Sequence, residues 1–374
     1  MIDIKSFLGN KNKNTLVLDM GSYNIKGVIG KYENNKIIVK DTFIIPILAD
    51  TYIDGKINDL LEVKERLKEG LEKNNIKTKH TICTIESSFV ISREIILPAI
   101  DKMDLGNMIN YEIGQYMPIE LEKYVLQYQI LEKIIEEDIQ KYRILVAALP
   151  KEIALSHFEL LEFLDLSPLA LDLHSNSICK LLSSGFTINN MKNFHEETIA
   201  VIDIGHNHIN VVIVENGIYR FSRMIDLGAR NIDMVIANYL SIDSEDIADY
   251  KYAMQDILLD RDEVAVSDDM EEHEIQSPMN DIIIDVLKSN IENWIEEINH
   301  VFKYYTSRRP TNRIDGILIY GGITALNGLD LYMANYFNIP TFRVDEISNI
   351  EFSNPSTKKD LGNYLNGIAA LIRR

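Results

Sequence analysis

One strand-turn-strand pattern occurs twice in this chain. The segment LVLDMGSYNIKGVIG, residues 16–30, is matched in spacing by AVIDIGHNHINVVIV, residues 200–214. In each copy an apolar run ends in a carboxylate, Asp19 or Asp203, a glycine follows two residues later, and an alternating apolar run continues. The copies are 184 residues apart (Asp19 to Asp203), far beyond the length of a solenoid repeat. The duplication predicts two similar α/β halves.

Composition and charge argue against two classes of binding partner, nucleic acids and anionic membranes. The 374 residues are enough for two hydrophobic cores. The 57 Asp and Glu against 38 Lys and Arg give a net charge of -19, which repels nucleic-acid phosphates and anionic lipids. We therefore expect no nucleic-acid partner and only indirect contact with a membrane. Cys83 and Cys179 have no CxxC spacing, and neither a signal peptide nor a membrane span is visible, so the sequence predicts a cytoplasmic protein.

Apolar periodicity outside the two copies predicts several further elements. A helix is expected over residues 60–74, and residues 88–166 have the pattern of strand, helix, two strands and helix. Residues 256–281 are acidic and poor in apolar side chains, as in a solvated loop. A long amphipathic helix is expected over residues 282–305, and a helix over residues 360–373 is expected to close the chain.

The first copy carries residues suited to binding phosphate and metal. Asp19 ends a strand beside the tight turn at Gly21, where a carboxylate can hold a hydrated Mg²⁺. The backbone N–H groups of the turn and the Ser22 hydroxyl can donate to phosphate oxygens, and Lys26 on the next strand adds a positive charge. Taken alone, such residues more often form an ordinary Asp-capped hairpin, so the motif gains its weight from the second copy.

The second copy places Asp203 and Gly205 in the same arrangement. Two such hairpins facing each other across a cleft would form a clamp for phosphate. A third motif, GGIT at residues 321–324, follows the apolar run ILIY and precedes a predicted helix. Glycines there allow the backbone to approach a flat ring or a phosphate closely, and the helix N-terminus adds its dipole.

In this order the motifs DxGS, DxG and YGGIT resemble the two phosphate loops and the adenosine loop of the superfamily of actin, sugar kinases and chaperones. The resemblance implies an actin-like fold, a duplicated ribonuclease H-like α/β fold with two lobes, that binds ATP and Mg²⁺ between the lobes. It implies that Asp19 and Asp203 flank the Mg²⁺, through water. It also implies nucleotide contacts by Gly21, Ser22, Tyr23, Asn24, Lys26, Gly205, His206, Asn207, Gly228, Gly321, Gly322 and Ile323. Where the superfamily usually has a second glycine after Gly228, this chain has Ala229.

Within that superfamily the chain resembles the PilM family of type IV pilus assembly proteins. The likeness lies in residues 92–131, residues 144–175 and the final YLNGIAALIRR. The first stretch carries the family's spacing of Arg93, Pro98, Glu112, Tyr116 and Pro118. Residues 88–166 resemble the extra subdomain of the division protein FtsA, which PilM shares. FtsA usually carries a linker and an amphipathic helix after its core, whereas this chain ends at Arg374, which favours PilM.

The resemblance also implies domain boundaries. The expected parts are an N-terminal tail (1–14), subdomain 1A (15–87 and 167–197), the FtsA-like subdomain 1C (88–166), subdomain 2A (198–227 and 314–374) and subdomain 2B (228–313), which contains the acidic loop at 256–281.

The function implied by the PilM resemblance is that of a cytoplasmic, ATP-binding adaptor in the inner-membrane assembly complex of type IV pili. It implies a peripheral place at the inner face of the cytoplasmic membrane, through the cytoplasmic N-terminal segment of a bitopic membrane protein, PilN. Contact with the pilus assembly ATPase is a further implied partner. A filament-forming actin homologue of the FtsA or MreB type is the alternative. A sugar- or acetate-kinase-like enzyme is a third possibility, for which no substrate-binding base is found.

Hydrolysis of ATP would require a side chain that orients the attacking water. Superfamily ATPases place a Glu or Gln in the segment corresponding to residues 171–177, which here is LDLHSNS and offers Asp172 and His174 instead. We therefore expect ATP binding with slow turnover at most, and the sequence assigns no catalytic residue.

Overall fold

The computed structural model of the chain describes residues 14–117, 119–191, 196–240, 278–354, 358 and 360–373. Apart from Asn14 and residues 278–281, the expected N-terminal tail and acidic loop lie outside the described residues. The chain divides into two compact units. Unit 1 comprises Met1–Ser184, Asn349–Thr357 and Asn366–Arg374, and unit 2 comprises Gly185–Ser348 and Lys358–Leu365.

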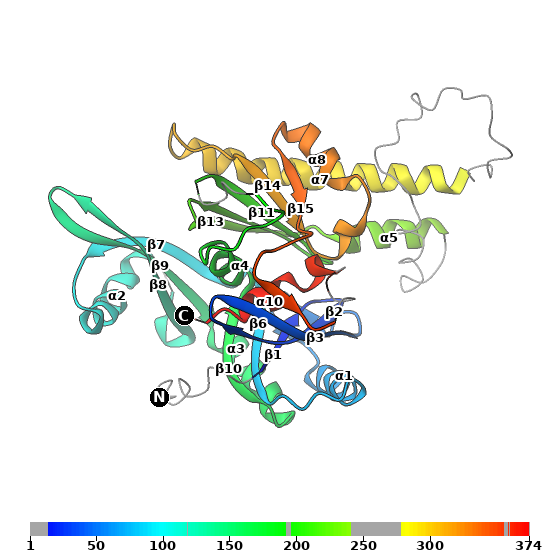
Figure 1. Cartoon of the computed structure of the whole chain (residues 1–374), viewed down its shortest axis with the longest axis horizontal. Helices are drawn as coiled ribbons and strands as arrows, with labels where there is room; N and C mark the ends of the chain where they lie inside the picture. The colour runs from blue at the N-terminus through cyan, green and yellow to red at the C-terminus, as the bar shows by residue number, and fades with distance from the viewer. Residues whose placement is uncertain are drawn as a thin grey trace. The chain divides into compact units, whose positions relative to one another are not determined.

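Unit 1 is built on a six-stranded sheet with the order β10-β6-β1-β2-β3-β16 (Figure 1). The strands β1, β2 and β3 are a consecutive antiparallel meander, and β6 and β10 continue the sheet parallel to β1. The residues of β1 and β6 are almost all buried, as expected for strands with both faces covered, whereas β3 alternates between buried and exposed residues. The strand bounds are β1 Thr15–Met20, β2 Asn24–Glu33, β3 Lys36–Pro46, β6 His80–Ile85, β10 Ser167–Leu173 and β16 Ile350–Phe352.

One face of this sheet packs against two helices. The helix α1 begins after Asp59, whose side chain accepts a hydrogen bond from the Glu62 N–H, and it buries Val63, Leu67 and Leu71 as one stripe. These residues share a core with strand side chains and with the helix α3. The remaining bounds are α1 Leu60–Lys73, α3 Lys151–Phe163, α4 His174–Leu182, α10 Leu365–Ala370 and the short hairpin strands β4 Tyr52–Ile53 and β5 Lys56–Ile57.

Residues 91–150 of unit 1 form a lobe with its own sheet and core, labelled β7, β8, β9 and α2 in Figure 1. The sheet has the order β7-β9-β8, and α2 packs its Leu105, Ile109 and Ile113 against Ile144 and Val146. Strand, helix, two strands and helix follow one another as the sequence predicts. The bounds are β7 Ile91–Pro98, α2 Lys102–Tyr116, the 3₁₀ turn η2 Leu121–Lys123, β8 Tyr124–Glu136 and β9 Ile139–Pro150.

Unit 2 is built on a five-stranded sheet with the order β13-β12-β11-β14-β15. Its core joins the sheet to the long helix α7, which contributes Trp294, the only tryptophan of the chain. The bounds are β11 Thr198–Ile204, β12 Ile209–Glu215, β13 Ile218–Ile225, α5 Ala229–Leu240, α7 Pro278–Ser307, β14 Gly316–Tyr320, η4 Gly322–Ala325, α8 Leu329–Phe337, β15 Thr341–Arg343 and η5 Leu361–Tyr364. Among the described residues, no helix is both long enough and apolar enough to cross a bilayer.

The two sheets repeat one arrangement, which confirms the predicted duplication. In unit 1, β1 pairs antiparallel with β2 and parallel with β6. In unit 2, β11 pairs antiparallel with β12 and parallel with β14. The register is also the same, because Asp19 lies opposite Lys26 and Asp203 lies opposite Asn210.

The C-terminal segment differs from the expected division of the chain. Residues 314–374 were all expected in the second half, but Asn366–Arg374 and the strand β16 belong to unit 1. The strand β16 pairs parallel with β3, and Gly367 lies so close to Val28 that a Cβ there would be 2.8 Å from the Val28 side chain. The closing helix is also shorter than predicted, since η5 and α10 together span Leu361–Ala370.

Candidate functional site

Asp19 is a buried carboxylate at the end of β1, with 4% of its surface exposed. Its Oδ1 accepts a hydrogen bond from Thr84 at 3.2 Å and lies 2.7 Å from Nε2 of His174. Burial alone would raise the pKa of Asp19, but His174, the charge of Lys26 and the Thr84 hydroxyl outweigh it, so the pKa lies below its ordinary value. Asp19 is therefore held as an anion in the interior.

The turn after β1 brings the predicted phosphate-binding residues of unit 1 together. A Cβ on Gly21 would lie 2.7 Å from the carbonyl oxygen of Asn24, so only glycine allows this turn to close as it does. Ser22 lies within the turn, and Tyr23 has 44% of its surface exposed. Lys26 lies on β2 directly opposite Asp19, where the sequence places it. The turn thus combines backbone N–H groups, a hydroxyl, a lysine and a carboxylate.

The turn after β11 has the same geometry in unit 2. The N–H of Gly205 donates to the carbonyl of His208 at 3.0 Å, and a Cβ on Gly205 would lie 2.9 Å from that oxygen. Gly228 packs against this turn, because a Cβ there would lie 2.4 Å from the carbonyl oxygen of His206. The N–H of Ala229 donates to the Gly205 carbonyl at 3.1 Å. The structure thus explains Gly228 by its close packing on the loop that carries His206 and Asn207.

Gly321 connects the third motif to Asp203. The strand β14 places Tyr320 beside Asp203, and the next residue, Gly321, has a φ of 105° and a ψ of 171°. A Cβ on Gly321 would lie 2.5 Å from the Ile204 carbonyl oxygen and 2.7 Å from Oδ1 of Asp203. This backbone conformation is almost exclusive to glycine. Gly321 therefore leaves the space beside the Asp203 carboxylate that any side chain would fill.

The other two residues of this motif have different surroundings. Gly322 begins η4, and a Cβ there would meet nothing nearer than Oδ1 of Asn363, at 3.7 Å. The side chain of Ile323 is 2% exposed and belongs to the core of unit 2. A nucleotide contact by Ile323, as the resemblance implies, would therefore involve its backbone, since the side chain is in the core.

Asp172 and His174, the two residues considered for orienting water, have separate tasks. The carboxylate of Asp172 accepts hydrogen bonds from the Leu173 N–H, Asn176 and Ser177, and it pairs with Lys180. Burial would raise the pKa of Asp172, but Lys180 and Asn176 lower it below its ordinary value. Asp172 is fully engaged in fastening α4 to β10. His174, the first residue of α4, contacts Asp19 instead.

Each unit carries one carboxylate near the end of the corresponding strand of its sheet, Asp19 on β1 and Asp203 on β11, and a carboxylate is a ligand type that suits Mg²⁺. Mg²⁺ keeps several waters and is usually bound through one or two carboxylates together with phosphate oxygens. In unit 1, Asp19 is held as an anion; in unit 2, Gly321 keeps the space beside Asp203 open. Among the described residues, no three His, Cys, Asp or Glu side chains cluster as a metal site.

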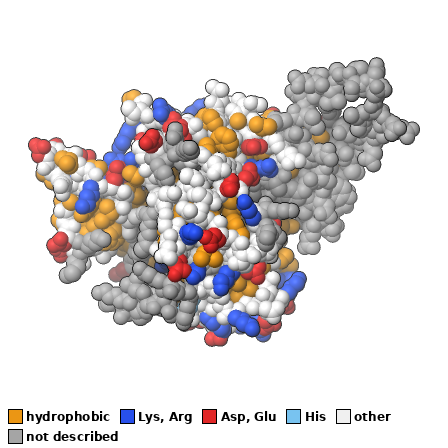
Figure 2. Space-filling view, in the orientation of Figure 1, with side chains coloured by type: hydrophobic (Ala, Val, Ile, Leu, Met, Phe, Trp, Pro, Cys, Tyr) orange, Lys and Arg blue, Asp and Glu red, His pale blue; other side chains and the backbone are white. Residues whose placement is uncertain are grey.

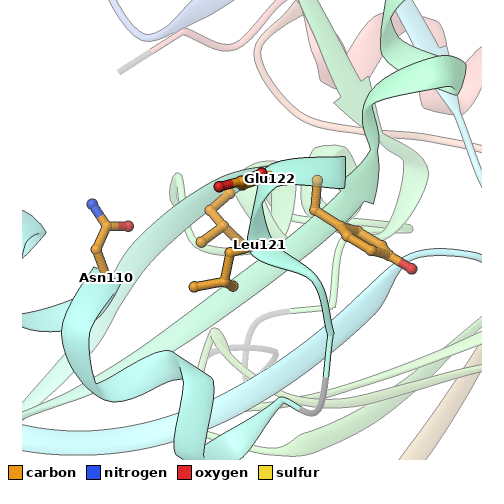
Figure 3. A pocket seen from close by; sticks show the side chains of 5 residues that line it. Asn110, Leu121 and Glu122 are labelled. Atoms are coloured by element: carbon orange, nitrogen blue, oxygen red, sulfur yellow. The ribbon is translucent and has the colours of Figure 1, made fainter.

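A pocket lies on the lobe of residues 91–150. It has a volume of about 410 Å³ and is lined by Asn110, Leu121, Glu122, Tyr124 and Leu126. Figure 3 shows Leu121 and Glu122 side by side, with Asn110 across the opening. In Figure 2 the lobe presents hydrophobic side chains with both acidic and basic ones among them. No pattern in the sequence indicates this pocket.

Next to the predicted residues lie Thr84 and Asn210, which the sequence did not indicate, and His174, which was considered only for orienting water. Thr84 lies beside Asp19 on β6, and His174 reaches Asp19 from α4, a helix that the periodicity did not reveal. Asn210 is buried opposite Asp203, at the position that Lys26 has in the first copy. Asn210 could have been found by aligning the two copies residue by residue, because it aligns with Lys26.

Comparison with known proteins shows two family likenesses. The family model of the type IV pilus assembly protein PilM matches residues 17–262. The family model of the cell division protein FtsA matches residues 200–362.

Two of the solved structures compared, a chain of a PilM-PilN complex and EutJ, support the fold. A chain of a PilM-PilN type IV pilus biogenesis complex is 16% identical with a TM-score of 0.73, and the match covers 96% of each chain. The ethanolamine utilization protein EutJ from Carboxydothermus hydrogenoformans is 13% identical with a TM-score of 0.51, covering 95% of this chain and 90% of EutJ. MreB 5 of Spiroplasma citri bound to AMPPNP is 12% identical with a TM-score of 0.48, covering 89% of this chain and 92% of MreB 5. The actin-like α/β fold expected from the sequence is confirmed.

Proposed function

The chain belongs to the PilM family of type IV pilus assembly proteins, and from this membership we propose that it is an ATP-binding adaptor at the cytoplasmic face of the inner membrane. On this proposal the turns after β1 and β11 bind the phosphates of one ATP, with Mg²⁺ held through water by Asp19 and Asp203. Nucleotide binding serves to fix a conformation of the protein, and turnover is slow. The adaptor binds the cytoplasmic N-terminal segment of a PilN-type membrane protein, and the pilus assembly ATPase is a further candidate partner.

The proposed ATP binding is supported mainly by the matching geometry of the turns after β1 and β11. Both follow a strand whose second-to-last residue is Asp. In both, a Cβ added to the glycine would lie less than 3 Å from the carbonyl oxygen of the residue three positions later. Neither turn could accept a side chain on its glycine, which keeps the backbone close to whatever binds there. The Gly321 loop adds a third close backbone approach, beside Asp203.

Calorimetric titration of the purified protein with ATP and Mg²⁺ tests this part. We expect Asp203→Asn to weaken Mg-ATP binding by at least about tenfold, because the carboxylate that orders the hydrated metal is lost. Asp285→Asn, the same change at an exposed side chain on α7, should leave the affinity unchanged. Phosphate release should be far slower than that of a motor ATPase. Equal affinities of wild type and Asp203→Asn would contradict the proposal.

The proposed binding of a PilN-type membrane protein is supported by the charge of the lobe of residues 91–150 and by its pocket. Residues 91–150 carry ten Asp and Glu against six Lys and Arg, so the surface of the lobe favours a basic partner. Cytoplasmic segments close to a membrane span carry an excess of Lys and Arg. The pocket pairs Glu122 with the apolar side chains Leu121 and Leu126, which suits a segment in which basic and apolar residues are neighbours. We therefore place the membrane protein's cytoplasmic segment at this pocket.

Binding of a fluorescent peptide with the cytoplasmic sequence of the PilN-type protein from the same cell tests the pocket. Glu122→Lys should weaken binding about fivefold, on the order of 1 kcal/mol, because an exposed attraction becomes a repulsion. Glu137→Lys makes the same charge change at the tip of the β8–β9 hairpin and should leave the affinity nearly unchanged. An equal loss of affinity in both variants would mean that only the net charge of the protein matters. No loss in either variant would mean that the peptide binds at a different surface.

The FtsA likeness of residues 200–362 supports one alternative, a filament-forming actin homologue. Sedimentation of the purified protein that depends on ATP, without binding of the peptide, would favour that function over the adaptor.

A further inference from the structure

Three parallel strands of unit 1 end in a row of polar side chains. The register of β1, β6 and β10 places Asp19 beside Thr84, and Thr84 beside Asp172. All three residues are buried, with at most 6% of their surfaces exposed. A buried carboxylate is stable as an anion only when hydrogen bonds or positive charge compensate it. The row therefore contains two carboxylates, each of which requires partners.

The helix α4 supplies partners to both carboxylates, but by different residues. Asp172 is compensated by side chains within α4, as described above, and this fastens the helix to β10. The N–H of Ser175 donates to Glu86 at 3.0 Å, which attaches the start of the helix to the segment after β6. His174 lies between these two attachments and is 9% exposed. Its backbone is thus fixed on both sides, with the imidazole against Asp19.

The contacts of Asp19 are unevenly divided between its two oxygens. Thr84 and His174 both approach Oδ1, at 3.2 Å and 2.7 Å. Within the described part of the chain, Oδ2 makes no hydrogen bond. A hydrated Mg²⁺ needs only one carboxylate oxygen as an acceptor for its water. The arrangement holds one oxygen of Asp19 and leaves the other for a ligand.

We propose that His174 is a positioning residue for the metal of the nucleotide: its Nε2, 2.7 Å from Oδ1 of Asp19, fixes that oxygen and leaves Oδ2 for the hydrated Mg²⁺. This inference rests on the proposed nucleotide binding and adds a residue that acts through Asp19. Hydrogen-bond partners that orient a metal-binding carboxylate change metal affinity by about 10- to 100-fold when they are removed. Asp172 has no such role, because its oxygens are occupied by α4.

The test separates binding of the metal from binding of the nucleotide. ATP affinity is measured by calorimetry with saturating Mg²⁺ and again in EDTA, for wild type, His174→Leu and His174→Gln. The ratio of the two affinities reports what the metal contributes. We expect His174→Leu to lower this ratio about tenfold with the EDTA affinity unchanged, and His174→Gln to restore it, since its amide N–H reaches the same oxygen.

Two further variants make the result specific. Asn176→Ala removes a hydrogen bond of 2.6 Å to Asp172 and loosens α4 without touching Asp19, so it should lower the melting temperature and leave the ratio unchanged. His174→Asn, whose shorter amide cannot reach Asp19, replaces His174→Leu if the leucine variant does not fold. A ratio in His174→Leu or His174→Asn equal to that of wild type overturns the positioning role, as does failure of His174→Gln to restore it. If wild type binds no ATP in either condition, the proposed function itself is wrong.

Discussion

Replacing Gly321 by alanine is expected to destabilise unit 2 by about 4 kcal/mol and to abolish ATP binding. The backbone of Gly321, with φ at 105° and ψ at 171°, lies in a region that costs another residue about 1 to 3 kcal/mol. The added methyl group would also lie 2.5 Å from the Ile204 carbonyl oxygen and 2.7 Å from Oδ1 of Asp203. Neither neighbour is the mobile end of a long side chain, so the loop or the strand end has to move.

Urea unfolding followed by tryptophan fluorescence measures the loss of stability of unit 2 in Gly321→Ala. Trp294 is the only tryptophan and is 2% exposed in the core of unit 2. The matched control is Gly322→Ala, one residue further, where the methyl group would meet nothing within 3.7 Å. We expect the control to unfold within about 1 kcal/mol of wild type. Similar losses in both variants would contradict the steric explanation.

The second large effect is a loss of stability of unit 1 between pH 6.5 and pH 4, caused by His157. The imidazole is 2% exposed within α3, with Nδ1 2.8 Å from the Ile153 carbonyl oxygen and Nε2 3.3 Å from the Tyr52 hydroxyl. Burial lowers the pKa of His157 from an ordinary 6.5 to about 4, and the Ile153 carbonyl opposes this only in part. The neutral ring donates to Ile153 from Nδ1 and accepts from Tyr52 at Nε2.

The sign of the effect follows from the lowered pKa. The unfolded chain binds a proton at His157 below pH 6.5, whereas the folded chain does so only near pH 4, so protonation favours unfolding in this window. Stability is complete above pH 6.5 and falls by about 3 kcal/mol on the way to pH 4. The lowered pKa values of Asp19 and Asp172 act below 3.8, so their contributions are lost at more acidic pH.

Unfolding by urea at several pH values, followed by circular dichroism, measures this slope. In His157→Gln the free energy of unfolding should no longer show the decrease that the histidine causes between pH 6.5 and pH 4. This holds even if the substitution changes the stability at pH 7. His300→Gln removes a histidine whose side chain is 67% exposed on α7, and it should keep the wild-type slope. If His157→Gln retains the slope, another group is responsible for it.

The loops of the candidate site could be predicted because they are local features of the sequence. Asp19 and Asp203 follow apolar runs and precede a glycine by two residues, and this spacing is enough to predict a strand end and a tight turn. The same holds for the glycines after β14. The lobe of residues 91–150 was also predictable in its element order, because its helix and strands differ clearly in apolar period.

The surroundings of these loops depend on strand register, which a single sequence does not reveal. Thr84 comes to Asp19 across 65 residues of chain, and only the parallel pairing of β1 with β6 places it there. His174 was considered for a different task because its helix begins with polar residues and was not recognised. Ile323 was expected at the ligand, yet its side chain completes the core, since a motif specifies a backbone path more reliably than the direction of each side chain.

The pairing of β16 with β3 gives the order in which the protein can fold during synthesis. The edge of the first sheet is completed by Ile350–Phe352, and Gly367 packs on Val28 of the same sheet. A ribosome therefore has to translate Gly185–Ser348, most of unit 2, before unit 1 can acquire its last strand, and the rest of unit 2 before it can acquire the closing segment from Asn366. Until then β3 is an open sheet edge, the kind of surface that chaperones protect from aggregation. The first half of this chain to be made is the last to be finished.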